Sequence, residues 1–172
     1  MSSLHQNMSQ DESKDDKKQN GEDILFNPYN PLNKEITYDD ITKLLKEYGI
    51  DHPIHSLRLY KRAFIHKSYC KQPHDKSLND EIQIEEKNFG CLSLSSKSNE
   101  RLEFLGDGVL ECITKQYLYS RFLRENEGFM TEKKIALVKN ESIGKIAYDM
   151  GLHKYFIISK QNEEKQTRTN LN

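Results

Sequence analysis

Hydrophobic residues recur with helical spacing through the middle of the chain. In the segment 37–49 they stand at positions i, i+3, i+4 and i+7, as Ile41, Leu44, Leu45 and Tyr48. This spacing places side chains on one face of an α-helix. Thr37 and Asp40 have the spacing of a capping box, and Gly49 supplies a stop signal. The pattern therefore predicts an amphipathic helix with defined ends.

Four further segments carry the same period, and we expect helices at 54–65, 99–123, 131–138 and 140–150. Pro53 suits the start of the first, where its missing N–H costs nothing. Thr131 marks the start of the third, and Gly151 suits the end of the last. No series of alternating apolar residues indicates a sheet. The pattern predicts an all-α domain.

Two stretches lack a sustained period. Residues 1–23 hold almost nothing that could form a core, so we expect a disordered tail and an ordered domain over 24–172. Residues 70–98 combine a proline, an acidic middle and a serine-rich end, and this length favours a flexible loop insertion. The alternations "EIQIE" and "CLSLS" leave room for a small hairpin. The end of the chain from 160 is polar.

Composition narrows the class of protein. The chain has 172 residues, enough for one domain with a core. Its formal net charge of −1 gives no general attraction for a polyanion. The three cysteines are scattered, which indicates neither a disulfide framework nor a zinc site and favours a reducing compartment. No run approaches the roughly 18 apolar residues that cross a bilayer. We expect a soluble protein without a membrane partner, intracellular in the cytoplasm or nucleus.

The segment 99–123 sets acids among apolar residues. On a helix, Glu100, Glu103, Asp107 and Glu111 fall within a stripe roughly 80° wide, opposite the main apolar positions. One interpretation is a solvated face, since acids in a first turn are favoured by the helix dipole. The other is a divalent-cation site, because carboxylates one turn apart can converge on Mg²⁺. Geometry alone leaves both open.

The same segment carries a recognisable motif. "NERLEFLGDGVL" at 99–110 resembles the signature of the ribonuclease III family, endonucleases of double-stranded RNA. The usual form is NERLEFLGDSVL, so Gly108 stands where the family has serine. "RAFIHKSY" at 62–69 resembles the upstream "ALTHRS" segment, and 125–152 resembles the downstream stretch that begins "DEG". The resemblance covers about 38–158 and is interrupted by the insertion.

The resemblance implies a fold and an activity. The fold is the all-α ribonuclease III endonuclease domain, which forms a homodimer through the signature helix. The activity is Mg²⁺-dependent hydrolysis of double-stranded RNA to 5′-phosphate and 3′-hydroxyl ends, with Mn²⁺ as a substitute ion. Glu103 and Asp107 match the carboxylates that bind the catalytic metal. Glu100 and Glu127 match further acids of the catalytic cleft.

Other residues are assigned less directly. Lys133, Lys134 and Lys139 lie near Glu127 in sequence and are candidates for contacts to RNA phosphates, although exposed helix lysines more often serve solubility. Glu111 matches no family role and is expected on a solvated face. For His66 we favour a packed or hydrogen-bonded structural role over a catalytic one.

The family's site also needs a second acidic pair, a DxxE on a later helix, and no DxxE follows Gly128 in this sequence. One interpretation is a fragment of a longer enzyme, which we favour. The other is a degenerate member that serves as a non-catalytic double-stranded-RNA-binding or scaffold module on the same dimeric fold. We expect the 172-residue chain alone to cleave weakly or not at all.

Overall fold

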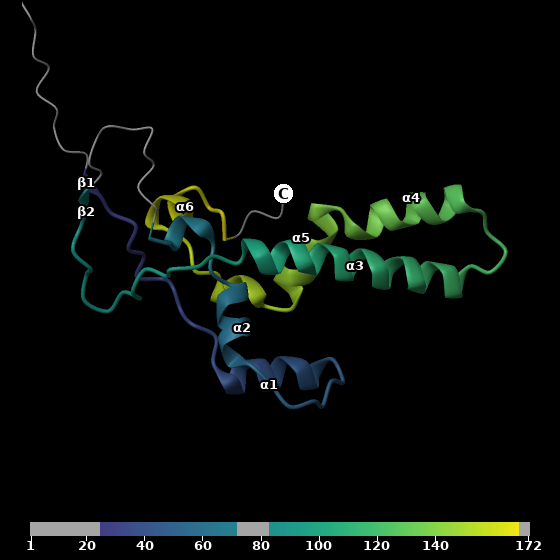
Figure 1. The fold of residues 1–172 in the computed structure, drawn as a ribbon, viewed down its shortest axis with the longest axis horizontal. Helices are drawn as coiled ribbons and strands as arrows, with labels where there is room; N and C mark the ends of the chain where they lie inside the picture. The colour runs from purple at the N-terminus through teal and green to yellow at the C-terminus, as the bar shows by residue number, and fades with distance from the viewer. Residues whose placement is uncertain (1–24, 72–82, 169–172) are drawn as a thin grey trace, which may run out of the picture.

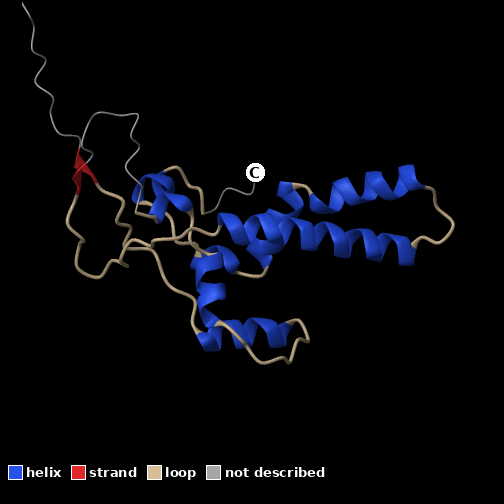
Figure 2. Ribbon diagram, in the orientation of Figure 1, coloured by secondary structure: helices blue, strands red, loops and turns tan. Residues whose placement is uncertain are grey.

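The structure is a computed structural model that describes residues 25–71 and 83–168. The predicted disordered tail, 1–23, lies outside these residues, as does 72–82 of the insertion. Helices dominate the described residues, with one pair of two-residue strands (Figure 2). The prediction of an all-α domain is confirmed. The elements are β1 Leu25–Phe26, α1 Tyr38–Glu47, α2 Leu57–Ala63, η1 Lys67–Tyr69, β2 Gln83–Ile84, α3 Glu100–Arg121, α4 Glu127–Val138, α5 Asn140–Asp149, η2 Leu152–Tyr155 and α6 Lys160–Glu164.

Helix α1 has the ends that its sequence predicts. The Asp40 N–H donates to Thr37 Oγ1 at 3.1 Å, and the Thr37 N–H donates to Asp40 Oδ2 at 3.0 Å, which completes the capping box. Gly49 follows the helix with a φ of 73°, a left-handed conformation that glycine adopts without strain. Ile41 is buried and anchors the helix to the core.

Helix α2 is shorter than predicted, because it begins at Leu57 and Pro53 lies in the loop before it. Its C-terminal end is limited by tertiary pairing. The His66 N–H donates to the Ile157 carbonyl at 3.0 Å, and the Ile157 N–H donates to the Phe64 carbonyl at 2.9 Å. These bonds end the helix after Ala63, because the backbone there pairs with the buried segment 157–159 instead of continuing the helix.

Helix α4 begins at Glu127, four residues before the predicted start at Thr131. Asn126 is the cap, because its side-chain oxygen accepts from the Phe129 N–H at 2.9 Å. The Thr131 hydroxyl instead donates to the Glu127 carboxylate at 2.7 Å, one turn earlier. The asparagine therefore starts the helix, and the threonine lies within it.

The part of the insertion that the structure describes, 83–98, is docked on the domain. The Ser95 N–H donates to the Tyr69 carbonyl at 3.1 Å, and the Tyr69 hydroxyl donates to the Leu92 carbonyl at 2.8 Å. Cys91 and Tyr69 are both buried. The predicted hairpin is wrong, since β2 pairs in parallel with β1 instead. The apolar residues of "CLSLS" serve core packing and not local strand pairing.

The end of the described chain is also better ordered than its polar sequence suggests. Ser159 caps the short helix α6, with its hydroxyl accepting from the Asn162 N–H at 3.3 Å. Glu163 in α6 forms an ion pair with Arg168 at 2.8 Å. The buried Asn30 side chain donates to the same Glu163 carboxylate at 2.8 Å. This polar cluster ties α6 to the entry loop before α1.

Helices α3 and α4 form an antiparallel pair that extends from the rest of the domain, with their connecting turn at the far end (Figure 1). Thr114 and Leu118 of α3 are buried. Phe122 and Phe129 pack edge to face across the turn, with ring centroids 5.2 Å apart. The start of α3 lies in the body of the domain, because the Asn99 N–H donates to the Ile65 carbonyl at 2.8 Å. The hairpin thus positions the acidic stripe beside α2 and η1.

Candidate functional site

The acidic stripe occupies the first half of α3. Glu100, Glu103 and Asp107 are all exposed and lie on one side of the helix. The Glu100 carboxylate accepts from the Ser98 hydroxyl at 2.9 Å, and its other oxygen lies 3.7 Å from Lys67 Nζ. Neither Glu103 nor Asp107 has a hydrogen-bond donor within 25–71 and 83–168. The structure therefore leaves the predicted metal-binding pair accessible.

Glu111 has a different environment from the other acids. Its carboxylate lies 2.9 Å from Lys115 Nζ on α3 and 3.3 Å from Lys134 Nζ on α4. Hydrogen bonds from Lys115 and then Lys134 lower the pKa of the Glu111 carboxyl. The Glu111 side chain is 46% exposed, as expected for a solvated face, and its ion pairs also link the two helices of the hairpin.

Glu127 does not join the stripe within one chain. It is the first residue of α4, at the far end of the hairpin from Glu103. Helix α3 has 22 residues and is therefore about 33 Å long. An acid at one end cannot share a cation with acids at the other end of a helix of that length.

The three candidate RNA-binding lysines all have neighbours within the domain. Lys133 lies over the Phe129 ring at 5.2 Å, and Lys134 pairs with Glu111. Lys139 pairs with Glu141 at 2.6 Å, and both of these side chains are exposed. Their contacts to RNA phosphate stay a prediction, and Lys134 is the least accessible of the three.

Two basic residues near the stripe were not predicted from the sequence as part of the site. Lys67 follows His66 in η1, and its ammonium approaches Glu100. Arg62 of α2 donates from Nε to the Ser98 carbonyl at 2.9 Å, just before α3. The signal was the upstream motif "RAFIHKSY", which contains both residues and which the pairing of Ile65 with Asn99 brings beside the signature helix.

The described residues contain no group of three or more His, Cys, Asp or Glu side chains arranged to hold a metal. Mg²⁺ in proteins commonly takes one or two carboxylates and keeps several waters. Glu103 and Asp107, one turn apart on the same face, supply such a pair. The donor set fits a hard cation such as Mg²⁺, with only part of its coordination coming from these residues.

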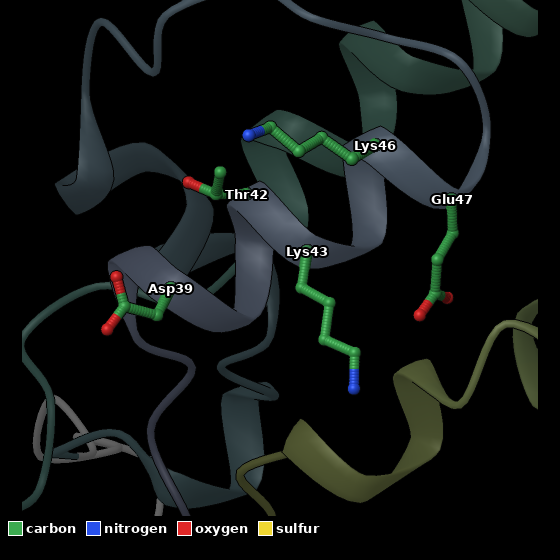
Figure 3. A pocket seen from close by; sticks show the side chains of 5 residues that line it. All are labelled: Asp39, Thr42, Lys43, Lys46 and Glu47. Carbon is green, nitrogen blue, oxygen red and sulfur yellow. The ribbon is translucent and has the colours of Figure 1, made fainter.

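Two surface depressions in the described part of the chain are not lined by the acids of the stripe. One, of about 540 Å³, follows α1 and is lined by Asp39, Thr42, Lys43, Lys46 and Glu47. Figure 3 shows that Lys43 and Lys46 extend in different directions, so the side chains do not converge on a ligand. The acidic stripe is an open helix face, which suits a large substrate better than an enclosed small molecule.

The apolar side of α3, opposite the stripe, is largely uncovered. Leu105, on the side opposite the stripe, is 63% exposed. Val109 and Ile113 continue the same exposed surface along the helix. Isolated apolar residues on a surface are ordinary, but a contiguous row on one helix indicates a contact surface. No helix in the described part of the chain has the length and apolar character to cross a membrane.

Comparison with known proteins gives one consistent result. Residues 100–172 match the ribonuclease III domain family. Ribonuclease 3 from Enterococcus faecalis is 35% identical over 128 residues, which are 74% of this chain and 47% of that protein. A probable ribonuclease 3 from Acanthamoeba polyphaga mimivirus is 33% identical over 147 residues, 84% of this chain and 26% of that protein. The chain thus spans less than half the length of these relatives.

A solved structure has the same fold. The nuclease domain of ribonuclease III from Campylobacter jejuni aligns with a TM-score of 0.56 and 27% identity, over 76% of this chain and 73% of that one. That structure is described as showing structural flexibility in the region involved in dimer formation.

Proposed function

Since this chain belongs to the ribonuclease III family, we propose that it carries part of the active site of an endonuclease that hydrolyses double-stranded RNA. The observation that carries the proposal is the pair of exposed carboxylates, Glu103 and Asp107, on the helix where the family match begins. A solvated acidic face does not account for the family signature at the same residues, which departs from the usual form only at Gly108. We propose that the protein acts in the cytoplasm or nucleus.

In this proposal Glu103 and Asp107 hold Mg²⁺, with Mn²⁺ as a substitute. The bound ion would lower the pKa of a water and stabilise the leaving oxygen. Glu100 stays at the edge of the cluster, oriented by the Ser98 hydroxyl and Lys67. A cation here would also offset the negative charge of the stripe. This offset helps a chain with a net charge of −1 to bind the polyanion RNA.

Recognition of the duplex would depend on shape, phosphates and 2′-hydroxyls, since side chains cannot read the deep major groove of A-form RNA. Lys133 and Lys139 are exposed on and after α4 and are proposed to contact phosphates. Lys134 would contribute indirectly, because its ammonium is shared with Glu111. We propose that 24–172 act together as one such domain.

We further propose that a second copy of the chain covers the apolar side of α3. Exposed Leu105, Val109 and Ile113 would then be buried between two signature helices. This assembly also gives Glu127 a place in a catalytic cleft. Because about 27 Å of α3 lies between Glu103 and the end of the helix near Glu127, Glu127 would reach the cleft of the other copy.

The second candidate is a non-catalytic module that binds duplex RNA on the same fold. It is favoured by the small number of metal ligands among the described residues. The two candidates differ in their need for a cation. A binding module retains RNA in EDTA, whereas an enzyme needs Mg²⁺ to release cut product.

The experiment compares the 172-residue chain with a chain lengthened by the family's DxxE-bearing helix. Both are incubated with a labelled RNA duplex in Mg²⁺ and in EDTA. We expect Mg²⁺-dependent cleavage by the lengthened chain and little or none by the shorter one. Retention of duplex in EDTA with no product from either chain would favour the binding module.

A further inference from the structure

The imidazole of His66 is held by several hydrogen-bond donors on one side. Its Nδ1 accepts from the Ser68 N–H at 3.2 Å, and the Ser68 hydroxyl lies 2.9 Å from the same nitrogen. Asn162 Nδ2, from α6, approaches it at 3.4 Å. The Ser159 N–H donates to Ser68 Oγ at 3.0 Å, which leaves the serine hydroxyl hydrogen free to point at Nδ1. The Ser68 and Asn162 groups thus all act as donors toward Nδ1.

This arrangement fixes the tautomer of the ring. A backbone N–H can only donate, so Nδ1 must be the acceptor, and the single proton of a neutral imidazole then resides on Nε2. Burial lowers the pKa of His66, and the charge of Lys67 lowers it further. With Nδ1 accepting, the ring is neutral and carries its N–H donor at Nε2. Within 25–71 and 83–168, Nε2 has no hydrogen-bond partner.

The backbone around His66 is joined to the start of the signature helix. The carbonyl of Ile65 accepts from the Asn99 N–H at 2.8 Å, and Lys67 Nζ lies 3.7 Å from Glu100. The charges of Glu100 and Glu103 both act on the ring, since each raises the pKa of His66 against the effect of burial. His66 is thus bonded to α6 through Nδ1, and its chain neighbours Ile65 and Lys67 contact the start of α3.

Glu100 and Glu103 differ in the hydrogen-bond donors and charges that surround their carboxylates. Glu100 accepts from Ser98 and faces Lys67. Glu103 has no donor among the described residues. Carboxylates that bind metals are as a rule hydrogen-bonded by neighbouring groups that orient them, and loss of such a group typically weakens metal binding by about 10- to 100-fold.

We propose that His66 is a positioning residue for the metal-binding carboxylate of Glu103, to which it donates a hydrogen bond from Nε2 when a divalent cation is bound. The inference depends on the proposed function, because it needs a cation at Glu103 and Asp107. It adds a residue to that site and replaces the purely structural role that the sequence favoured. The Ser68 and Asn162 contacts act by keeping the proton on Nε2.

His153 shows what a packed histidine looks like in this domain. It is half-buried, its ring stacks on Tyr148 with centroids 4.2 Å apart, and its Nδ1 has no hydrogen-bond partner within the described ranges. No set of donors fixes its tautomer. His153 is therefore the matched control for His66.

The first test measures Mn²⁺ binding to the 172-residue chain by the loss of the free-ion electron paramagnetic resonance signal. His66→Phe removes the donor and should weaken binding about 10-fold or more, whereas His66→Gln keeps an N–H near the position of Nε2 and should restore most of the affinity. His153→Phe should leave binding unchanged. Melting curves for each variant report whether the domain is folded.

Two outcomes separate this proposal from the proposed function. If Glu103→Gln and Asp107→Asn bind Mn²⁺ as well as the parent chain, the metal site itself is absent and both proposals fail. If those two variants lose binding but His66→Phe, still folded, keeps it, only the role of His66 is overturned.

A second measurement needs no substitution at His66 and stays informative if His66→Phe does not fold. Nitrogen-15 NMR of the imidazole rings reads the tautomer directly. We expect the proton on Nε2 of His66 and a change in that resonance on addition of Mg²⁺, with no change for His153 and none in Glu103→Gln. A proton on Nδ1, or a His66 resonance insensitive to Mg²⁺, would overturn the proposal.

Discussion

The contact between Arg168 and Glu163 should contribute strongly to the stability of the domain. Arg168 Nε lies 3.0 and 3.1 Å from the two Glu163 oxygens, and Nη2 lies 2.8 Å from one of them. The side chains are only 12% and 19% exposed. Removing one partner of a buried pair costs about 3–5 kcal/mol, and the partial exposure here places Arg168→Met near the lower figure, about 3 kcal/mol. For a chain of this size that corresponds to a fall in melting temperature of about 6–12 °C.

The effect should also depend on pH with a defined sign. The hydrogen bond from Arg168 is the main cause that lowers the pKa of Glu163 below its ordinary 4.5. Because the pKa is lower in the folded state, the ionised carboxylate adds stability above about pH 4.5, and this contribution is lost as the pH falls through the folded pKa. Arg168→Met should therefore lose less stability on acidification than the parent chain.

Urea unfolding at pH 7 and at several pH values down to 3 tests both statements. Arg124→Met is the control, since Arg124 is exposed in the turn before α4 and has no ion pair within 25–71 and 83–168. Unfolding free energies that agree within about 0.5 kcal/mol for Arg168→Met and the parent chain would refute the reasoning, because surface changes lie in that range.

Three further predictions concern the α3–α4 hairpin. Asn126→Ala removes the cap of α4 and should cost about 1 kcal/mol in urea unfolding, whereas Thr131→Ala, at the predicted but incorrect start, should cost less; equal losses would contradict the capping role. Lys134→Met breaks the contact between α4 and Glu111 and should cost less than about 1 kcal/mol, an effect that shrinks in high salt; a loss unaffected by salt would point to packing instead. Val109→Glu on the exposed side of α3 should convert a dimer to a monomer in sedimentation velocity, with exposed Glu132→Lys on α4 as the control; an unchanged dimer would place the interface elsewhere.

The sequence predicted helices well wherever their signals are local. The capping box of α1 and the glycine stops at Gly49 and Gly151 lie within a few residues of the helices they bound, so sequence reading finds them. The errors arise from tertiary contacts. Helix α2 ends where the backbones of Phe64 and His66 hydrogen-bond to Ile157, about 90 residues further along the chain. No local sequence pattern encodes that pairing.

The site shows the same division between local and distant information. Periodicity placed Glu100, Glu103 and Asp107 on one face of a helix. The family motif then favoured a metal site over a merely solvated acidic face. The sequence did not reveal that Glu111 belongs to a different cluster, since its partner Lys134 comes from α4. Nor could it show that Glu127 lies most of the length of α3 away from Glu103, because the order of motifs along the chain gives no distance.

The docking of 83–98 was missed for a related reason. A long segment with mixed composition is usually a loop, but Cys91 and Leu92 find their partner in Tyr69, which the sequence gives no means to identify. The described part of the insertion, 83–98, is hydrogen-bonded to Tyr69 and Lys71, which follow the turn that carries His66 and Lys67. Its contacts thereby support the residues beside the acidic stripe.

The most direct test of the central claim is the chemistry of the RNA ends produced by the chain that includes a DxxE-bearing helix. With Mg²⁺ the account predicts short duplexes with 5′-phosphate and 3′-hydroxyl ends, and loss of all product in both Glu103→Gln and Asp107→Asn. Product formation that continues at the parent rate in these two variants would contradict it.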